Sequence, residues 1–202
     1  MKTYIYMVRH GESPKTEGDE RTRGLTEKGR SDARIITQLL KDEGIDAFIS
    51  SPYQRAVATI EELAQSVGKE IVVFEELREL VFIGDNQIMA DNELYPLVKK
   101  MFTEPDFSLP GGESITICRN RVVRTFRNIL EKYKGQKVAI GTHGAVMTLM
   151  MGYFDSQYDL DFLLTTSKPD IYKMEFQDEV LVETKRLWKN GLPIKNGGLL
   201  DG

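Results

Sequence analysis

The sequence contains little cysteine: Cys118 is the only one in 202 residues. A single cysteine excludes an internal disulfide and is typical of proteins in a reducing compartment. No apolar run is long enough to cross a membrane, and the first residues show no signal-peptide pattern. We therefore expect a cytoplasmic protein without a membrane partner. Cys118 is spaced like the apolar residues of a helix, so we interpret it as a small core residue.

An excess of positive charge is also absent. The chain has 27 lysines and arginines against 31 aspartates and glutamates, which gives a formal net charge of −4. Proteins that bind nucleic acid generally show a basic excess or stripe, so we expect no nucleic-acid partner. Two histidines and one cysteine are a poor supply of transition-metal ligands. We expect neither a metal nor another cofactor.

Strand-like and helical patterns alternate along the chain, and its length fits a single domain over residues 1–202. Apolar runs predict strands at 3–8, 47–49, 71–74 and 137–141, and amphipathic stretches predict helices at 26–43, 51–68, 113–133 and after His143. This alternation favours an α/β fold with a largely parallel central sheet. Ser51 and Pro52 are typical of an N-cap and a first helical residue. Late strands near 171–176 and 180–186 suggest an antiparallel hairpin, and the tail after Trp188 is predicted to be irregular.

Residues 77–112 interrupt the alternation. Only Leu94–Phe102 has a helical pattern, and its flanks are rich in glycine and proline. Long excursions between regular elements often serve as lids or binding segments. We predict a lid or substrate-selecting insertion at about 77–112.

His10 and His143 are the only histidines. Each follows a strand-like apolar run and precedes a glycine. Ligands bind at the carboxyl ends of the strands in open parallel sheets. The two histidines are therefore expected to share one pocket, although each alone could be a core histidine without a catalytic role.

Five short segments resemble motifs of the histidine phosphatase superfamily, also called phosphoglycerate-mutase-like. They are Arg-His-Gly-Glu at 9–12, Leu-Thr-Glu-Lys-Gly at 25–29, Ser-Ser-Pro-Tyr-Gln-Arg-Ala at 50–56, Pro-Gly-Gly-Glu-Ser at 110–114 and Thr-His-Gly at 142–144. They follow one another in the family's order. The short loop after the first motif looks more like small phosphatases of this superfamily than like the glycolytic mutases. The resemblance implies a three-layer α/β/α fold.

The resemblance also implies a role for each matched residue. His10 would be the nucleophile that is transiently phosphorylated, and neighbouring cations favour the neutral imidazole that this requires. Arg9 and Arg55 would hold the phosphoryl oxygens, because a guanidinium fork matches phosphate. His143 would complete the pocket and stabilise charge on the transferring group. The alternative for Arg55 is a surface salt bridge.

Glu79 is the candidate general acid, because Leu77-Arg78-Glu79 resembles the family's Leu-x-Glu segment. A proton donor of this kind has to be protonated near neutral pH, through burial or through the charge of the phosphate. A solvated glutamate is the alternative, and Glu76 and Glu12 are the next candidates. For Glu12 itself we favour a supporting contact with an arginine.

Arg21 and Arg23 lie in the short loop 14–24 and either face an acidic substrate or are solvated. The favoured function is a metal-independent phosphomonoester hydrolase that acts through phosphohistidine. The expected substrate is a small phosphorylated metabolite or a phosphoprotein. The alternatives are a cofactor-dependent phosphoglycerate-type mutase and a non-catalytic phosphate- or phosphoprotein-binding regulator. A homodimer is one alternative for the quaternary state, which the sequence leaves open.

Overall fold

The computed structural model describes residues 1–15, 18–84, 89–189 and 192–194. Its strands are β1 (Lys2–Arg9), β2 (Ala47–Ser50), β3 (Ile71–Val73), β4 (Lys137–Thr142), β5 (Asp170–Gln177), β6 (Val180–Arg186), β7 (Trp188–Lys189) and β8 (Leu192–Pro193). Its helices are α1 (Glu27–Leu40), α2 (Gln54–Ser66), α3 (Asp91–Thr103), α4 (Ile115–Lys132), α5 (Gly144–Phe154) and α6 (Leu160–Thr165), with a 3₁₀ turn at Glu75–Leu77.

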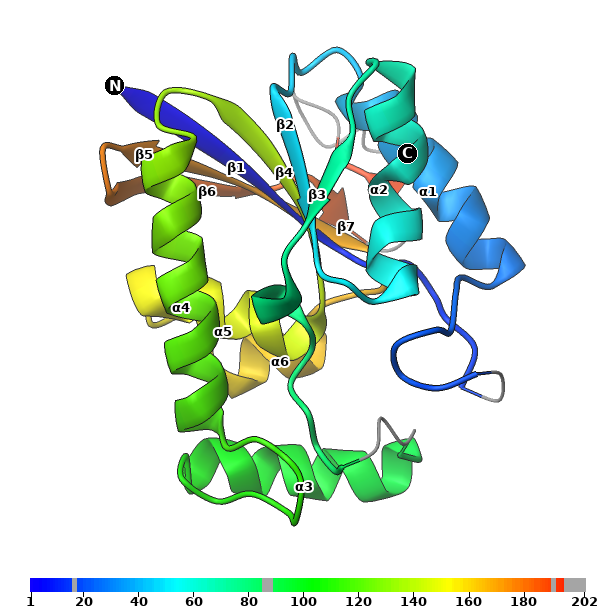
Figure 1. Cartoon of the computed structure of the whole chain (residues 1–202), viewed down its shortest axis with the longest axis vertical. Helices are drawn as coiled ribbons and strands as arrows, with labels where there is room; N and C mark the ends of the chain where they lie inside the picture. The colour runs from blue at the N-terminus through cyan, green and yellow to red at the C-terminus, as the bar shows by residue number, and fades with distance from the viewer. Residues whose placement is uncertain (16–17, 85–88, 190–191, 195–202) are drawn as a thin grey trace, which may run out of the picture.

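A six-stranded sheet with the order β3-β2-β4-β1-β5-β6 forms the middle of the molecule (Figure 1). The first four strands in this order are parallel, and β5 and β6 run antiparallel to their neighbours. The predicted α/β class, the largely parallel sheet and the late hairpin are therefore confirmed. The register pairs Arg9 of β1 with Thr142 of β4, so the residues that follow these two strands lie at one edge of the sheet.

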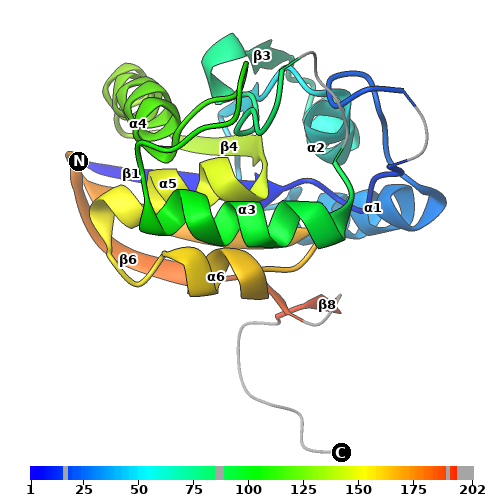
Figure 2. The same cartoon turned by 90° about the horizontal axis from the view of Figure 1, so that it is seen from below.

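Helices cover both faces of the sheet, which gives the predicted three layers (Figure 2). Successive side chains of β1 alternate between the two cores. Ile5 and Met7 pack in the core with α4 and α5, whereas Tyr6 and Val8 pack in the core with α1 and α2. All four side chains are fully buried. Because β1 is buried on both faces, its sequence is a continuous apolar run without polar alternation.

Side chains cap α1 and α4, whereas the one cap predicted from the sequence, Ser51 for α2, is not formed. Thr26 and Ser114 cap α1 and α4 through side-chain oxygens that accept backbone N–H groups. In contrast, α2 begins at Gln54, after Ser51 and Pro52, so the prediction of Ser51 as its N-cap is wrong. The Ser51 hydroxyl instead accepts the N–H of Tyr53 at 3.2 Å and contacts a histidine ring. This hydroxyl belongs to the site, not to the helix end.

The segment 77–112 and the tail depart from regular sheet-and-helix order in different ways. Within the segment, α3 is longer than predicted and lies across the lower end of the molecule (Figure 1), and residues 85–88 lie outside the described residues. The tail was predicted to be irregular, but β7 and β8 form a short antiparallel pair. Residues 195–202 lie outside the described residues.

The prediction that Cys118 is a core residue is confirmed, because it is fully buried.

In the described part of the chain, no helix is long and apolar enough to span a membrane.

Candidate active site

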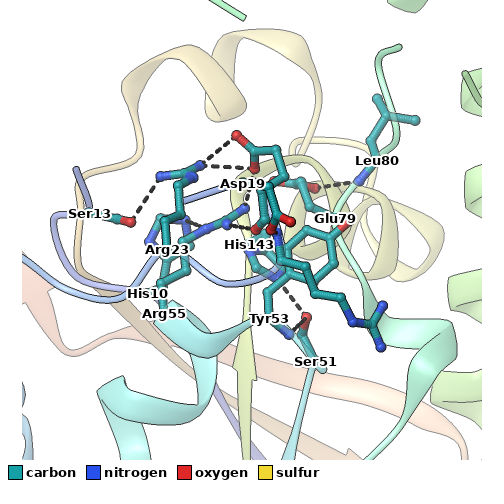
Figure 3. A network of polar contacts seen from close by, with 12 residues as sticks. His10, Ser13, Asp19, Arg23, Ser51, Tyr53, Arg55, Glu79, Leu80 and His143 are labelled. Atoms are coloured by element: carbon teal, nitrogen blue, oxygen red, sulfur yellow. Dashed lines mark hydrogen bonds and ion pairs between the residues drawn. The ribbon is translucent and has the colours of Figure 1, made fainter. Parts of the chain in front are cut away.

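His10 and His143 meet at the carboxyl edge of the sheet, where β1 and β4 end side by side. Their ring centroids lie 5.2 Å apart with the rings edge to face. Figure 3 shows the two histidines together with Arg55, which contacts His10, and with Ser51 and Tyr53, which contact His143. The parallel register of β1 and β4 thus brings together two motifs that are distant in the sequence.

The His10 imidazole is held in one orientation and one tautomer. Its Nδ1 lies 2.7 Å from the carbonyl oxygen of Gly11, which only accepts, so Nδ1 carries the proton. The other nitrogen, Nε2, accepts the Nε–H of Arg55 at 3.2 Å. Burial, followed by the charge of Arg55, lowers the pKa of His10 well below its usual value. His10 is therefore neutral at neutral pH, with a lone pair on Nε2.

His143 lies deeper than His10 and is fully buried. Its Nε2 is 2.6 Å from the hydroxyl of Ser51, and its ring meets Tyr53 edge to face at 5.1 Å. Its Nδ1 has no hydrogen-bond partner among the residues that the structure describes. Burial, followed by the charge of Arg55, lowers the pKa of His143 well below its usual value. The site thus holds a second neutral imidazole with an unused nitrogen.

Arg9 and Arg55 bring two buried cations to these imidazoles. Arg55 is 1% exposed in the first turn of α2, and Arg9 is 8% exposed at the end of β1. Nη1 of Arg9 donates to the carbonyl of Thr166 at 2.8 Å. A Cβ at Gly144 would lie 2.8 Å from Nη2 of Arg9, so a larger residue here would displace the guanidinium from its present place. Burial lowers the pKa of both arginines, but a guanidinium keeps its charge in proteins.

The carboxylate of Glu20 forms ion pairs with two arginines of the site, Arg55 and Arg23. Its Oε2 lies 2.8 Å from Nη2 of Arg55, and its Oε1 lies 2.9 Å from Nη2 of Arg23. Arg23 is 8% exposed and lines the cavity described below. Glu20 cannot be predicted from the sequence, because an acidic residue in a polar loop outside the motifs carries no signal.

Arg21 does not join this group. Its guanidinium makes a two-pronged ion pair with Glu75, with N–O distances of 2.9 and 2.7 Å. The side chain is 45% exposed and is not part of the cavity wall. Of the two loop arginines considered as substrate-binding, the structure brings only Arg23 to the site.

Glu79 reaches the site from the segment after the 3₁₀ turn. Its Oε1 accepts the N–H of Val146 at 3.1 Å, and its Oε2 accepts that of Ala145 at 3.3 Å. The carboxyl group is thus seated on the N-terminus of α5, immediately after His143 and Gly144, and it lines the cavity. A helix N-terminus offers free N–H groups to such a group.

The other acid candidates lie away from the cavity. Glu12 is exposed and accepts the hydroxyl of Thr26 at 2.9 Å, so the predicted contact between Glu12 and an arginine is replaced by one near the start of α1. Glu76 is exposed and is not part of the cavity wall. Glu20 is the second carboxyl that lines the cavity.

Glu113 of the Gly-Gly-Glu-Ser segment fixes the irregular segment that carries Glu79. Its carboxylate pairs with Arg78 at 2.9 Å and with Arg121 at 2.6 Å. Its backbone N–H donates to the carbonyl of Val81 at 2.7 Å. Because these contacts flank position 79 on both sides, they fix the place of its carboxyl group.

The site opens into a cavity of about 360 Å³. Arg9, His10, Arg23 and Arg55 lie among its wall residues together with Glu20 and Glu79. Within the described ranges, no group of three or more His, Cys, Asp or Glu residues is arranged to hold a metal ion. The arrangement combines a neutral imidazole, buried guanidinium groups and a carboxyl group, which suits transfer of an anionic group to His10.

Comparison with known proteins gives one consistent family. The model of the histidine phosphatase superfamily (branch 1) matches residues 5–184. Phosphoglycerate mutase-like protein 4 of Arabidopsis thaliana is 31% identical over 156 residues, which cover 71% of this chain and 67% of that protein. The solved structure of Bacillus stearothermophilus YhfR is 26% identical with a TM-score of 0.74, covering 89% of this chain and 94% of that chain.

A further solved structure supports the fold. The alpha-ribazole phosphatase from Shigella flexneri has a TM-score of 0.75 at 18% identity, covering 96% of this chain and all of that chain (100%). The long family match, taken with the matched motifs at the sheet edge, leads to one conclusion: this chain belongs to the histidine phosphatase superfamily, branch 1.

Proposed function

We propose that this chain is a phosphomonoester hydrolase of the small-phosphatase kind, acting through a phosphohistidine on His10. One observation carries the proposal. The unprotonated Nε2 of His10 faces the buried guanidinium of Arg55 in a group of cations that opens into a cavity. A neutral nucleophile beside fixed positive charge is what attack on a phosphate dianion requires.

In the first step, Nε2 of His10 attacks phosphorus and the ester P–O bond breaks. Arg9 and Arg55 balance the charge of the phosphoryl oxygens, and the unused Nδ1 of His143 donates to one of them. The leaving alkoxide takes a proton from Glu79.

In the second step, water attacks the phosphohistidine. Its proton goes to the Glu79 carboxylate, the N–P bond breaks, and the electron pair returns to Nε2 of His10. Orthophosphate and the free enzyme result. Every group in this cycle belongs to the chain, the substrate or water, so the cycle as proposed uses no metal and no cofactor.

A phosphoglycerate-type mutase shares the first step and is the main alternative. It passes the phosphoryl group to a second hydroxyl instead of water and depends on a bisphosphorylated cofactor. A non-catalytic phosphate-binding regulator is the alternative outside enzymes. That reading is disfavoured because His10, Arg9, Arg55 and His143 are all present.

The deciding assay measures orthophosphate released from a panel of phosphomonoesters in excess EDTA, with and without 2,3-bisphosphoglycerate. We expect stoichiometric release of alcohol and phosphate, unchanged by either addition, because the proposed charges come from side chains. Release that is lost in EDTA and restored by magnesium would point to a metal mechanism. Transfer between hydroxyls that needs the bisphosphate would favour the mutase.

Arg55→Gln is expected to weaken inhibition by vanadate about 10- to 150-fold, the loss of roughly 1.5–3 kcal/mol for one charged hydrogen bond. Vanadate adopts the five-coordinate geometry of the transferring phosphorus, and Arg55 lies 3.2 Å from the attacking nitrogen. The measurement is the inhibition constant against p-nitrophenyl phosphate. Arg127→Gln is the matched control, because Arg127 is 54% exposed on α4 and pairs with Glu179 at the surface. Unchanged inhibition in a folded Arg55 variant contradicts a shared anion site.

A further inference from the structure

A large part of the cavity wall is apolar, and it begins directly beside the charged groups. Resting on the proposed hydrolase activity, we propose that the preferred substrates are phosphomonoesters whose alcohol is itself apolar: an alkyl chain or an aromatic ring. The cavity thus joins an anion site to an apolar chamber, and each part binds one part of the ester.

Three separate segments build the apolar wall. They contribute Leu80 and Phe82 from the stretch after Glu79, Leu94 and Val98 from α3, and Leu163 and Leu164 from α6. Leu80 is 3% exposed and Val98 is 4% exposed, so the wall is anchored in the core. Tyr95 also lines the cavity but is 51% exposed, which leaves part of an aromatic ring uncovered.

The position of Glu79 fixes which part of the substrate meets this wall. Glu79 is the proposed donor to the leaving oxygen, and the next residue, Leu80, already belongs to the apolar wall. The carbon chain that is attached to the leaving oxygen therefore enters the space between α3 and α6. The volume of about 360 Å³ lies within the range of small-molecule sites, which favours a compact organic group over a folded phosphoprotein.

A glycerate-type ester suits this wall poorly. Besides the phosphate it carries a hydroxyl group and a carboxylate, and burying such groups without partners is costly. Lys15 and Lys168 also line the cavity, so a doubly anionic ester is included in the test. Apolar carbon, in contrast, gains free energy with each methylene that it buries.

The test compares ethyl, butyl and hexyl phosphate with glycerol 3-phosphate and 3-phosphoglycerate. The three alkyl esters release primary alcohols of similar leaving ability, so differences in kcat/KM among them report on binding in the apolar chamber. We expect kcat/KM to rise about two- to fourfold per methylene. Hexyl phosphate should exceed both glycerol 3-phosphate and 3-phosphoglycerate. Equal values for ethyl and hexyl phosphate, or a 3-phosphoglycerate value above that of hexyl phosphate, would overturn the inference.

Two variants test the wall itself. Leu94→Ser and Tyr95→Ser should each flatten the rise of kcat/KM from ethyl to hexyl phosphate, because each replaces apolar surface of the wall by a polar group. Lys99→Ser is the matched control, because Lys99 is exposed on the same helix and is not part of the wall. A dependence that persists in both wall variants also overturns the inference. Failure of the proposed function looks different, since then none of the esters, ethyl phosphate included, releases phosphate.

Discussion

His10→Asn is expected to lower kcat at least about 10⁴-fold, because removing a catalytic nucleophile eliminates the covalent route. Asparagine resembles imidazole in size and polarity, so the fold should persist. The loss should appear with p-nitrophenyl phosphate as well as with alkyl esters, because both need attack on phosphorus. The measurement is the steady-state release of phosphate, with thermal unfolding as the control for folding.

The small number of histidines makes the covalent intermediate easy to assign. A phosphohistidine on this chain can lie only on His10 or His143. Wild-type protein and His143→Asn, quenched in base after mixing with labelled substrate, should carry label on the peptide that contains residue 10. His10→Asn should carry none. Label on another residue, or full turnover by His10→Asn, would remove His10 from the mechanism.

Glu79→Gln is expected to slow the cleavage of alkyl phosphates about 10²–10⁴-fold, the usual contribution of a general acid. Cleavage of p-nitrophenyl phosphate should fall far less, because nitrophenoxide leaves without a proton. The structure provides the reason for choosing this carboxyl: Glu79 lines the cavity and is fixed by the N–H groups of Ala145 and Val146. The glutamine oxygen can keep part of this contact.

Single-turnover formation of the phosphohistidine is the proper readout for Glu79, because slow dephosphorylation could mask a change in the first step. Glu76→Gln is the matched control, as Glu76 lies nearby but is exposed and outside the cavity wall. If both substrate types slow equally in Glu79→Gln, the acid is elsewhere. Glu20 then becomes the next carboxyl to replace, since it also lines the cavity.

The sequence predicts those parts of the fold that depend on local patterns. Alternating strands and helices give the sheet, and an apolar run such as residues 3–8 indicates a strand buried on both faces. Residues that follow strand ends, here His10 and His143, can be placed together because parallel topology leaves few choices. The motif at 50–56 indicates Arg55 because a phosphate site needs a guanidinium near a helix start.

The remaining features depend on contacts between distant segments. Glu20 meets Arg55 across 35 positions, and nothing in its own neighbourhood indicates this pairing. Ser51 looks like a helix cap because that is a common use of serine before proline, but its hydroxyl instead contacts His143. The apolar wall forms because residues of α3 and α6 line the same cavity. The hydrophobic periodicity of each helix alone does not indicate that they do.

Glu20 also has a consequence for the end of the catalytic cycle. Its carboxylate is tied to the same chain as Arg55 and Arg23, so it competes with any anion at a high effective concentration whatever the solution contains. Free orthophosphate has to displace this internal anion in order to stay. In the proposed cycle, the release of phosphate is therefore coupled to the return of the Glu20 carboxylate to Arg55 and Arg23.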